Sequence, residues 1–264
     1  MDASLFREGP PLPRPFRECF DAFARLMPRK RLSSLVCLDI GMPSVSVSSA
    51  LRSLGGAWRT VVRSPDVVRA AAESLADDKV VCLDADGSVP YASHVFDCIL
   101  VGPGMLAAVP DRTSFVKECN RILKPSGLLL LSARVRRPLS PVSAALRRAA
   151  PGDPRTRSFS EQELYGLLKT GFDVAESQWF GKFWYELAYA RGLSLTCAGV
   201  GADDAARMTA RAFSMAAFLD KAAFFSRGHE VVLAARRRQW RERSVPVPHD
   251  GRSLGEAVLF NPPA

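Results

Sequence analysis

The chain has 264 residues, of which 47% are hydrophobic and 24% charged, so it can bury a full core as one domain with additions. Its net charge of +9 favours an anionic partner, either nucleic acid or a lipid headgroup surface. No apolar run reaches the roughly 18 residues of a membrane span, and the N-terminus lacks the basic and then apolar pattern of a secretion signal.

Six cysteines are present, but no two form a Cys-x-x-Cys pair, and no histidine lies at metal-ligand spacing from them. Cys37, Cys82 and Cys98 fall inside expected strands, where a free thiol behaves as a small core side chain. This usage predicts a reducing compartment, with neither a metal site nor a disulfide framework. We therefore expect a cytoplasmic chain, peripheral to a membrane if its basic surface meets lipid.

The first half of the chain alternates buried strands with amphipathic helices. Strands at this spacing are typical of right-handed βαβ units, so we expect a mainly parallel sheet covered on both faces. Ser64 is expected to cap the third helix, with Pro65 at its first position. The expected strands are residues 34–40, 58–62, 80–83, 95–101 and 128–133, and the expected helices are residues 16–26, 45–54, 67–76 and 112–123.

The second half opens with an Arg- and Pro-rich stretch, residues 134–157, which we expect to be irregular. Ser160 and Glu163 have the spacing of a capping box and predict the start of a helix. The basic run 236–243 and the residues after it are expected to form a solvated, flexible tail. Between them we expect a strand at 172–177, helical segments at 179–195 and 205–225, and a last strand at 230–235.

The most informative segment is residues 36–41, Val-Cys-Leu-Asp-Ile-Gly, which predicts a central strand that ends in a tight turn. Gly41 permits the turn and lets a ligand approach the backbone closely. In an open α/β sheet, small molecules bind in the crevice beyond the carboxyl ends of the strands. Asp39, inside this apolar strand, needs polar partners, and the backbone N–H groups of the following loop are expected to supply them.

Four places, taken in order, resemble the class I S-adenosylmethionine-dependent methyltransferases of the group called type 11. Residues 38–41, Leu-Asp-Ile-Gly, are similar to the family's glycine-rich first motif, and residues 84–97 are similar to its D-x-x-x-x-P-F … F-D stretch. Residues 115–127 are similar to its E-x-x-R-V-L-K-P-G-G helix and turn, and residues 225–235 to its final strand. The resemblance covers residues 34–135 well and 158–238 more loosely.

The resemblance implies a doubly wound α/β fold, with a mainly parallel, seven-stranded Rossmann-like sheet and a final antiparallel strand. It divides the chain into an N-terminal arm and helix at 1–33, a methyltransferase-like domain at 34–238 with a helical cover at about 179–225, and a basic tail at 239–264. It also implies S-adenosylmethionine as the cofactor and no metal. The residues at the cofactor's place are Asp39, Gly41, Met42, Arg63, Asp84, Ala85 and Gly102.

The cofactor motifs depart from the family pattern. The first motif usually reads D-x-G-x-G-x-G, but only Gly41 remains, and the β-branched Val45 stands near the place of the last glycine. Arg63 stands where the family has an acid that accepts both ribose hydroxyls, and a guanidinium can only donate hydrogen bonds. The segment after the fourth strand carries no titratable group. We therefore expect cofactor binding to be weak or lost.

No catalytic residue is predicted. Tyr165, Tyr185 and Glu186 lie in the region that covers the site in relatives, and they are the candidates for contact with a substrate. Surface positions are expected for all three histidines, His94, His229 and His249.

Two functions fit these features. The first is methyl transfer from S-adenosylmethionine to a small-molecule, glycan or lipid-type acceptor, which can proceed mainly by positioning the nucleophile. The alternative is a catalytically inactive relative that serves as a binding or scaffold module, and the lost first motif and Arg63 favour it.

The expected partner is a small-molecule or lipid-linked substrate. An anionic membrane surface is a further candidate, and nucleic acid is less favoured because aromatic residues are not interleaved with the arginine run. The cations that would contact such a membrane are Lys182, Arg191, Arg207, Arg211 and Lys221 of the helical segments, or Arg236, Arg237, Arg238, Arg241 and Arg243 of the basic run.

Overall fold

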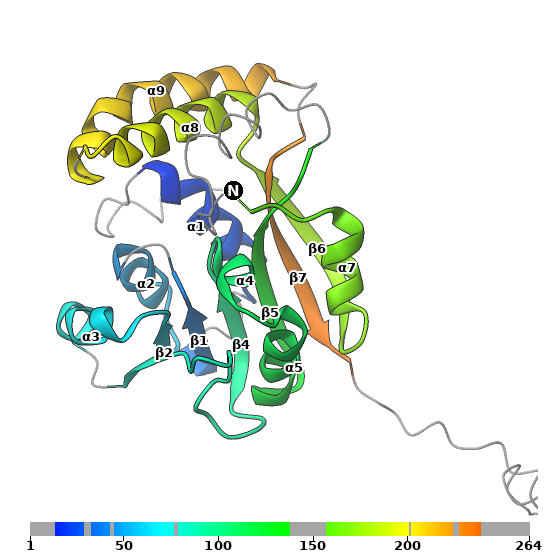
Figure 1. Cartoon of the computed structure of the whole chain (residues 1–264). Coiled ribbons are helices and arrows are strands. Elements are labelled where there is room, and N and C mark those ends of the chain that lie inside the picture. The colour runs from blue at the N-terminus through cyan, green and yellow to red at the C-terminus, as the bar shows by residue number, and fades with distance from the viewer. Residues whose placement is uncertain are drawn as a thin grey trace, which may run out of the picture.

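A seven-stranded sheet forms the centre of the computed structural model, with strand order β3-β2-β1-β4-β5-β7-β6 (Figure 1). The structure describes residues 14–28, 33–42, 45–76, 79–137, 157–200, 202–223 and 227–238. The strands are β1 Val36–Ile40, β2 Ala57–Val62, β3 Val80–Cys82, β4 Phe96–Val101, β5 Leu123–Arg134, β6 Phe172–Phe180 and β7 Glu230–Arg237.

The direction of the strands confirms the predicted fold class. Strands β3, β2, β1, β4 and β5 pair in parallel, whereas β7 is antiparallel to both β5 and β6. Strand β1 lies inside the sheet, between β2 and β4. The carboxyl ends of the parallel strands therefore meet at one edge, as the sequence predicted.

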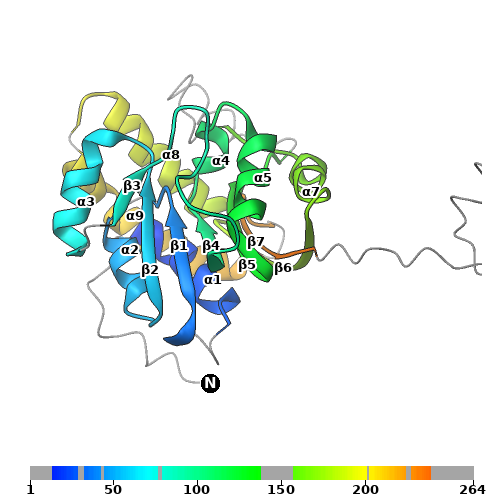
Figure 2. The same cartoon turned by 90° about the horizontal axis from the view of Figure 1, so that it is seen from below.

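Helices cover both faces of the sheet (Figure 2). Helices α1 and α2 pack on one face through a buried cluster that includes Phe23 and Leu51, and α4, α5 and α7 pack on the other through Met105, Phe115 and Leu164. The helices are α1 Arg14–Leu26, α2 Val45–Arg52, the 3-10 turn η3 Pro65–Val67, α3 Val68–Leu75, α4 Met105–Ala108, α5 Arg112–Ile122, α7 Glu161–Leu168, α8 Phe183–Cys197 and α9 Ala202–Ala222.

Helices α8 and α9 form an antiparallel hairpin that crosses one end of the molecule above α1 (Figure 1). Tyr185 of α8 stacks edge-to-face on Phe213 of α9, and the carboxylate of Asp220 accepts hydrogen bonds from the backbone N–H groups of Trp184 and Tyr185. Because α1 shares a core with the sheet, we propose that α1 folds as one unit with the described residues between 34 and 238.

Three local predictions need correction. Ser64 occupies the N-cap position of the 3-10 turn η3 and Pro65 follows it, as predicted, but the Ser64 side chain makes no capping bond. Its hydroxyl instead donates to a carboxylate oxygen of Asp66 at 3.2 Å. Trp179 belongs to β6, so the helical cover begins at α8. The basic run is not wholly a tail, because β7 includes Arg236 and Arg237. The tail at 239–264 lies outside the described residues.

The capping box at the start of α7 is confirmed. The Ser160 hydroxyl accepts a bond from the Glu163 N–H at 3.1 Å, and the Glu163 carboxylate accepts one from the Ser160 N–H at 2.6 Å. We expect Ser160→Ala to lower the free energy of unfolding by about 1 kcal/mol, measured by urea denaturation. The control is Ser214→Ala inside α9, where the hydroxyl only bonds the carbonyl one turn earlier and its loss should cost nothing. Equal effects of the two variants would contradict the assignment.

Candidate functional site

The ends of β1 and β4 form the edge at which the sequence places a ligand. The backbone N–H of Gly41 donates to the carbonyl of Val61 at 2.8 Å, and the N–H of Gly102 donates to the carbonyl of Ile40 at 2.8 Å. Gly41 has a φ of +62°, in the left-handed region that favours glycine. The predicted turn after β1 is therefore present.

The space beside both glycines is filled by the chain itself. A Cβ built on Gly41 would lie 2.5 Å from the sulfur of Met105, and a Cβ built on Gly102 would lie 2.3 Å from the carbonyl oxygen of Gly41. Met105 is 3% exposed and belongs to the core on the α5 face. The two glycines thus permit internal packing at the edge where a cofactor would approach.

Gly102→Ala tests how tightly this edge is packed. The added methyl group would meet backbone atoms of Gly41 and Met42, which cannot move as a flexible side chain can, so we expect the free energy of unfolding to fall by about 1–3 kcal/mol. Gly166→Ala in α7 is the matched control, since its Cβ would meet nothing within 4 Å, and there we expect a gain of about 0.5–1 kcal/mol. Denaturant melts of both variants check this, and a Gly102→Ala protein as stable as wild type would contradict the packing.

Asp39 is fully buried, and its described partners are side chains. Oδ1 accepts a bond from the Ser48 hydroxyl at 3.1 Å, while Oδ2 accepts bonds from the Thr60 hydroxyl at 3.0 Å and from Arg52 at 3.2 Å. Burial raises the pKa of Asp39 to about 6, although Arg52 opposes the rise. The predicted partners, backbone N–H groups of the following loop, are not found among the described residues, and side chains take their place. Asp39 ties β1 to β2 and α2.

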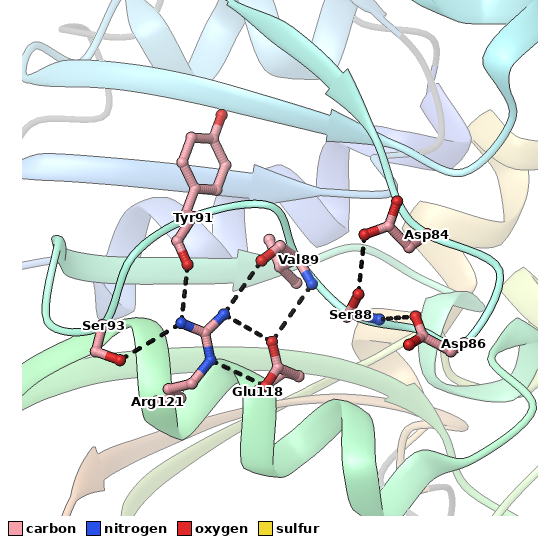
Figure 3. Close-up of polar contacts among 8 residues, drawn as sticks. All are labelled: Asp84, Asp86, Ser88, Val89, Tyr91, Ser93, Glu118 and Arg121. Carbon is pink, nitrogen blue, oxygen red and sulfur yellow. Dashed lines mark hydrogen bonds and ion pairs between the residues drawn. The ribbon is translucent and has the colours of Figure 1, made fainter.

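Asp84 and Ala85 lie in an exposed turn after β3. A carboxylate oxygen of Asp84 accepts a bond from the Ser88 hydroxyl at 2.9 Å (Figure 3). The Asp84 carbonyl also accepts a bond from the N–H of Gly87 at 2.9 Å. Asp86 accepts a bond from the N–H of Ser88 in the same turn. These bonds give Asp84 a structural role in closing the turn.

The motif similar to E-x-x-R-V-L-K-P-G-G holds the neighbouring loop in place. Arg121 pairs with Glu118 at 2.8 Å and donates to the carbonyls of Val89 and Tyr91 (Figure 3). At the opposite edge of the sheet, Asp97 accepts a bond from the N–H of Val36 at 2.9 Å and pairs with Lys124. Both sets of contacts are structural.

The remaining candidates do not complete a binding site for S-adenosylmethionine. Arg63 is exposed just after β2, and Met42 packs against the core on the α1 face. A side chain at Gly41 would clash with Met105, a side chain at Gly102 would clash with the Gly41 backbone, and Arg63 has no acceptor for ribose hydroxyls. The residues present therefore do not fit the cofactor in the way the resemblance implied, and its assignment to these seven positions stays a prediction.

Sequence reasoning missed a buried ionic group near the edge, which we call the Arg134 cluster: Arg134, Glu186, His229 and Glu230. Arg134 ends β5 and donates to Glu186 at 2.6 Å and Glu230 at 2.9 Å. His229, 4% exposed, lies 3.8 Å from Glu186, so its predicted surface position was wrong. His94 is exposed as predicted, and His249 lies outside the described residues.

Burial controls the protonation of this cluster. The single guanidinium of Arg134 pairs with two carboxylates. Burial raises the pKa of Glu186 to about 7, although the charge of Arg134 opposes the rise. Burial, together with the nearby Arg134 and Arg137, lowers the pKa of His229 to about 4. One oxygen of Glu186 and Nδ1 of His229 lack hydrogen-bond partners. Of the candidates for substrate contact, Glu186 and Tyr185 are thus buried, whereas Tyr165 is exposed on α7.

Two cavities are lined by residues away from the β1–β4 edge. One, of about 480 Å³, lies between the start of α5 and α7 and is lined by Arg112 and Phe159. The other, of about 350 Å³, is lined by Tyr165, Trp179 and Lys182. Within the described part of the chain, no group of three or more His, Cys, Asp or Glu side chains could hold a metal ion, and no helix has the length and apolar character needed to cross a membrane.

Residues 38–131 match the family model Methyltransf_11, described as a methyltransferase domain. These residues match a methyltransferase domain, and the sheet has the strand order of the class I methyltransferase fold. The match runs from within β1 to within β5, and it includes Gly41, Gly102, Met105 and the structural Glu118–Arg121 motif. No curated protein matches the chain in sequence.

Solved structures share the fold of this methyltransferase domain at low identity. A putative methyltransferase from Bacillus halodurans is 16% identical, with a TM-score of 0.57 over 83% of this chain and 100% of that chain. A possible histamine N-methyltransferase from Thermotoga maritima is 17% identical, with a TM-score of 0.54 over 84% and 89%. The cyclase SpnF is 21% identical, with a TM-score of 0.54 over 83% and 79%.

Proposed function

We propose that this methyltransferase domain has lost methyl transfer from S-adenosylmethionine and that the chain acts as a binding or scaffold module. The observation that carries the proposal is the filled edge, where Met105 lies against Gly41 and the Gly41 carbonyl lies against Gly102. Arg63 in place of a ribose-binding acid supports the same conclusion. The cyclase name of SpnF is consistent with it, because a fold does not fix a function.

Methyl transfer to a small-molecule, glycan or lipid-type acceptor is the second candidate. The ordered family motifs within residues 38–131 favour it, as does the retention of Asp39, Gly41 and Asp84. In that case the Met105 side chain would have to move away from Gly41 before a ligand entered. Free buried thiols, among them Cys37 and Cys98, support a reducing compartment for either function.

Isothermal titration calorimetry with S-adenosylmethionine and S-adenosylhomocysteine separates the two functions. We expect the full chain to give no heat beyond dilution at millimolar ligand. The variant Arg63→Asp restores the missing acid, and under the proposal it too gives no heat, because the edge stays filled.

Saturable binding by wild type would contradict the proposal. The second candidate function predicts in addition that Arg63→Asp binds S-adenosylmethionine about ten- to a hundredfold more tightly than wild type does. The reason is that charge-assisted hydrogen bonds to the ribose are worth roughly 1.5–3 kcal/mol. Arg63→Met, which removes the cation without adding an acceptor, is the matched control.

A further inference from the structure

The outer face of α9 carries the most exposed large hydrophobic side chains among the described residues. Met208 is 62% exposed, Met215 is 65% exposed and Phe218 is 74% exposed. Spacings of seven and three residues place them on one side of the helix. We call these three residues the α9 stripe. Leu187, 48% exposed, adds a further apolar side chain on α8.

The inner face of α9 holds smaller and more polar side chains than the α9 stripe. Thr209, Ala216 and Asp220 are buried there beside Phe213. In a helix that only covers a sheet, the apolar side faces the core and the polar side faces water. The exposed stripe on α9 departs from that pattern, and it lies on the side of the helix opposite to Thr209, Ala216 and Asp220. The stripe therefore faces away from the core.

The charged side chains of the hairpin that the structure describes are sorted by sign. Among the α8 and α9 side chains that the structure describes, the acids Glu186 and Asp220 are buried, whereas the cations Arg191, Arg211 and Lys221 are exposed. Arg211 lies between Met208 and Met215 along the helix, at spacings of three and four residues. The outer surface thus combines apolar side chains with positive charge.

We propose that the α9 stripe docks on an anionic lipid bilayer. Met and Phe side chains enter the boundary between headgroups and acyl chains, and Arg191, Arg211 and Lys221 contact the lipid phosphates. A surface of mixed apolar and cationic character fits such a bilayer, whereas two copies of the chain would bring the same cations together. The inference goes beyond the proposed function and holds whether or not S-adenosylmethionine binds.

Sedimentation of the full chain with vesicles tests the proposal. Vesicles of phosphatidylcholine with phosphatidylglycerol are compared with vesicles of phosphatidylcholine alone, at low and at physiological salt. We expect wild type to sediment with the anionic vesicles and to be released as salt rises, because charges at the surface are screened within about 8 Å at physiological ionic strength.

Two variants separate the apolar and the charged contributions, while the basic tail stays intact in both. Met215→Gln/Phe218→Gln should weaken binding about tenfold or more, since these side chains lose their place in the acyl boundary. Arg211→Gln/Lys221→Gln should weaken binding several-fold and flatten its salt dependence. The control is Val67→Gln, which changes another exposed apolar side chain, 47% exposed, away from the hairpin and should bind as wild type does.

Three results would overturn the proposal. The first is wild type that stays out of the pellet with anionic vesicles at low salt, and the second is α9 variants that bind as tightly as Val67→Gln. The third is a dimer in ultracentrifugation that Met215→Gln/Phe218→Gln converts to a monomer, which would assign the stripe to contact between copies. The melting temperature of each variant is measured as well. A value close to that of wild type shows that a change in vesicle binding comes from the altered surface and not from unfolding.

Discussion

Replacing Arg134 with methionine is expected to lower the free energy of unfolding by about 3–5 kcal/mol, since it leaves Glu186 and Glu230 buried without their cation. The guanidinium is 9% exposed and also lies over the ring of Tyr189, 4.9 Å from its centre. Methionine keeps much of the volume of the arginine side chain, so the loss of stability measures the removed charge and hydrogen bonds. Urea denaturation with two independent probes measures the change.

Arg136→Met is the matched control for this prediction. Arg136 is two residues further along the chain and 54% exposed, and its pair with Glu163 spans 3.8 Å, so its loss should cost less than about 1 kcal/mol. The double variant Arg134→Met/Glu186→Gln removes one of the two carboxylates left without a cation, so it should recover part of the lost free energy of unfolding. An Arg134→Met protein as stable as Arg136→Met would contradict the importance of the Arg134 cluster.

Replacing Glu186 with glutamine is expected to have an effect that changes with pH. The folded pKa of Glu186, about 7, lies above its ordinary value of 4.5, so the folded chain binds this proton more tightly than the unfolded chain does. The resulting stabilisation is fully present below pH 4.5 and is lost as pH rises through about 7. Relative to Glu186→Gln, wild type should therefore lose about 2–3 kcal/mol between pH 4.5 and 8.

The comparison with Glu186→Gln isolates this titration from that of His229. The pKa of His229 is lowered to about 4 by burial, so its stabilisation has the opposite sign: it is present above pH 6.5 and is lost as pH falls through about 4. Because His229 is present in both proteins, most of its contribution cancels in the difference. The check is the free energy of unfolding of both proteins, measured across this pH range. If the difference between the two free energies stays constant with pH, the pKa of Glu186 is not raised in the folded chain.

The fold could be predicted because its signals are local. The alternation of apolar strands with helices determined the βαβ order, and the Ser160–Glu163 pair marked the start of α7. Even there, the end of β7 was missed, because Arg236 and Arg237 resemble a solvated run in sequence but pair with β5 and β6 in the sheet. Backbone pairing across a sheet does not depend on the character of each side chain.

The candidate site was harder to predict because its decisive contacts are long-range. Met105 belongs to an apolar segment with no chemical signal, and only the folded chain places its sulfur against Gly41. The partners of Arg134 lie 52 and 96 residues along the chain, so sequence reasoning had no local spacing to recognise. Asp39 was correctly identified as needing partners, but Thr60 comes from the neighbouring strand.

We infer that the chain itself fills the edge at which the resemblance places S-adenosylmethionine. The most direct measurement is a crystal structure of the chain grown with millimolar S-adenosylhomocysteine. We predict that the Met105 sulfur stays against Gly41, that the Gly41 carbonyl stays against Gly102, and that no ligand density lies between β1 and β4. Ligand density at Gly41, with the Met105 side chain displaced, would contradict the account.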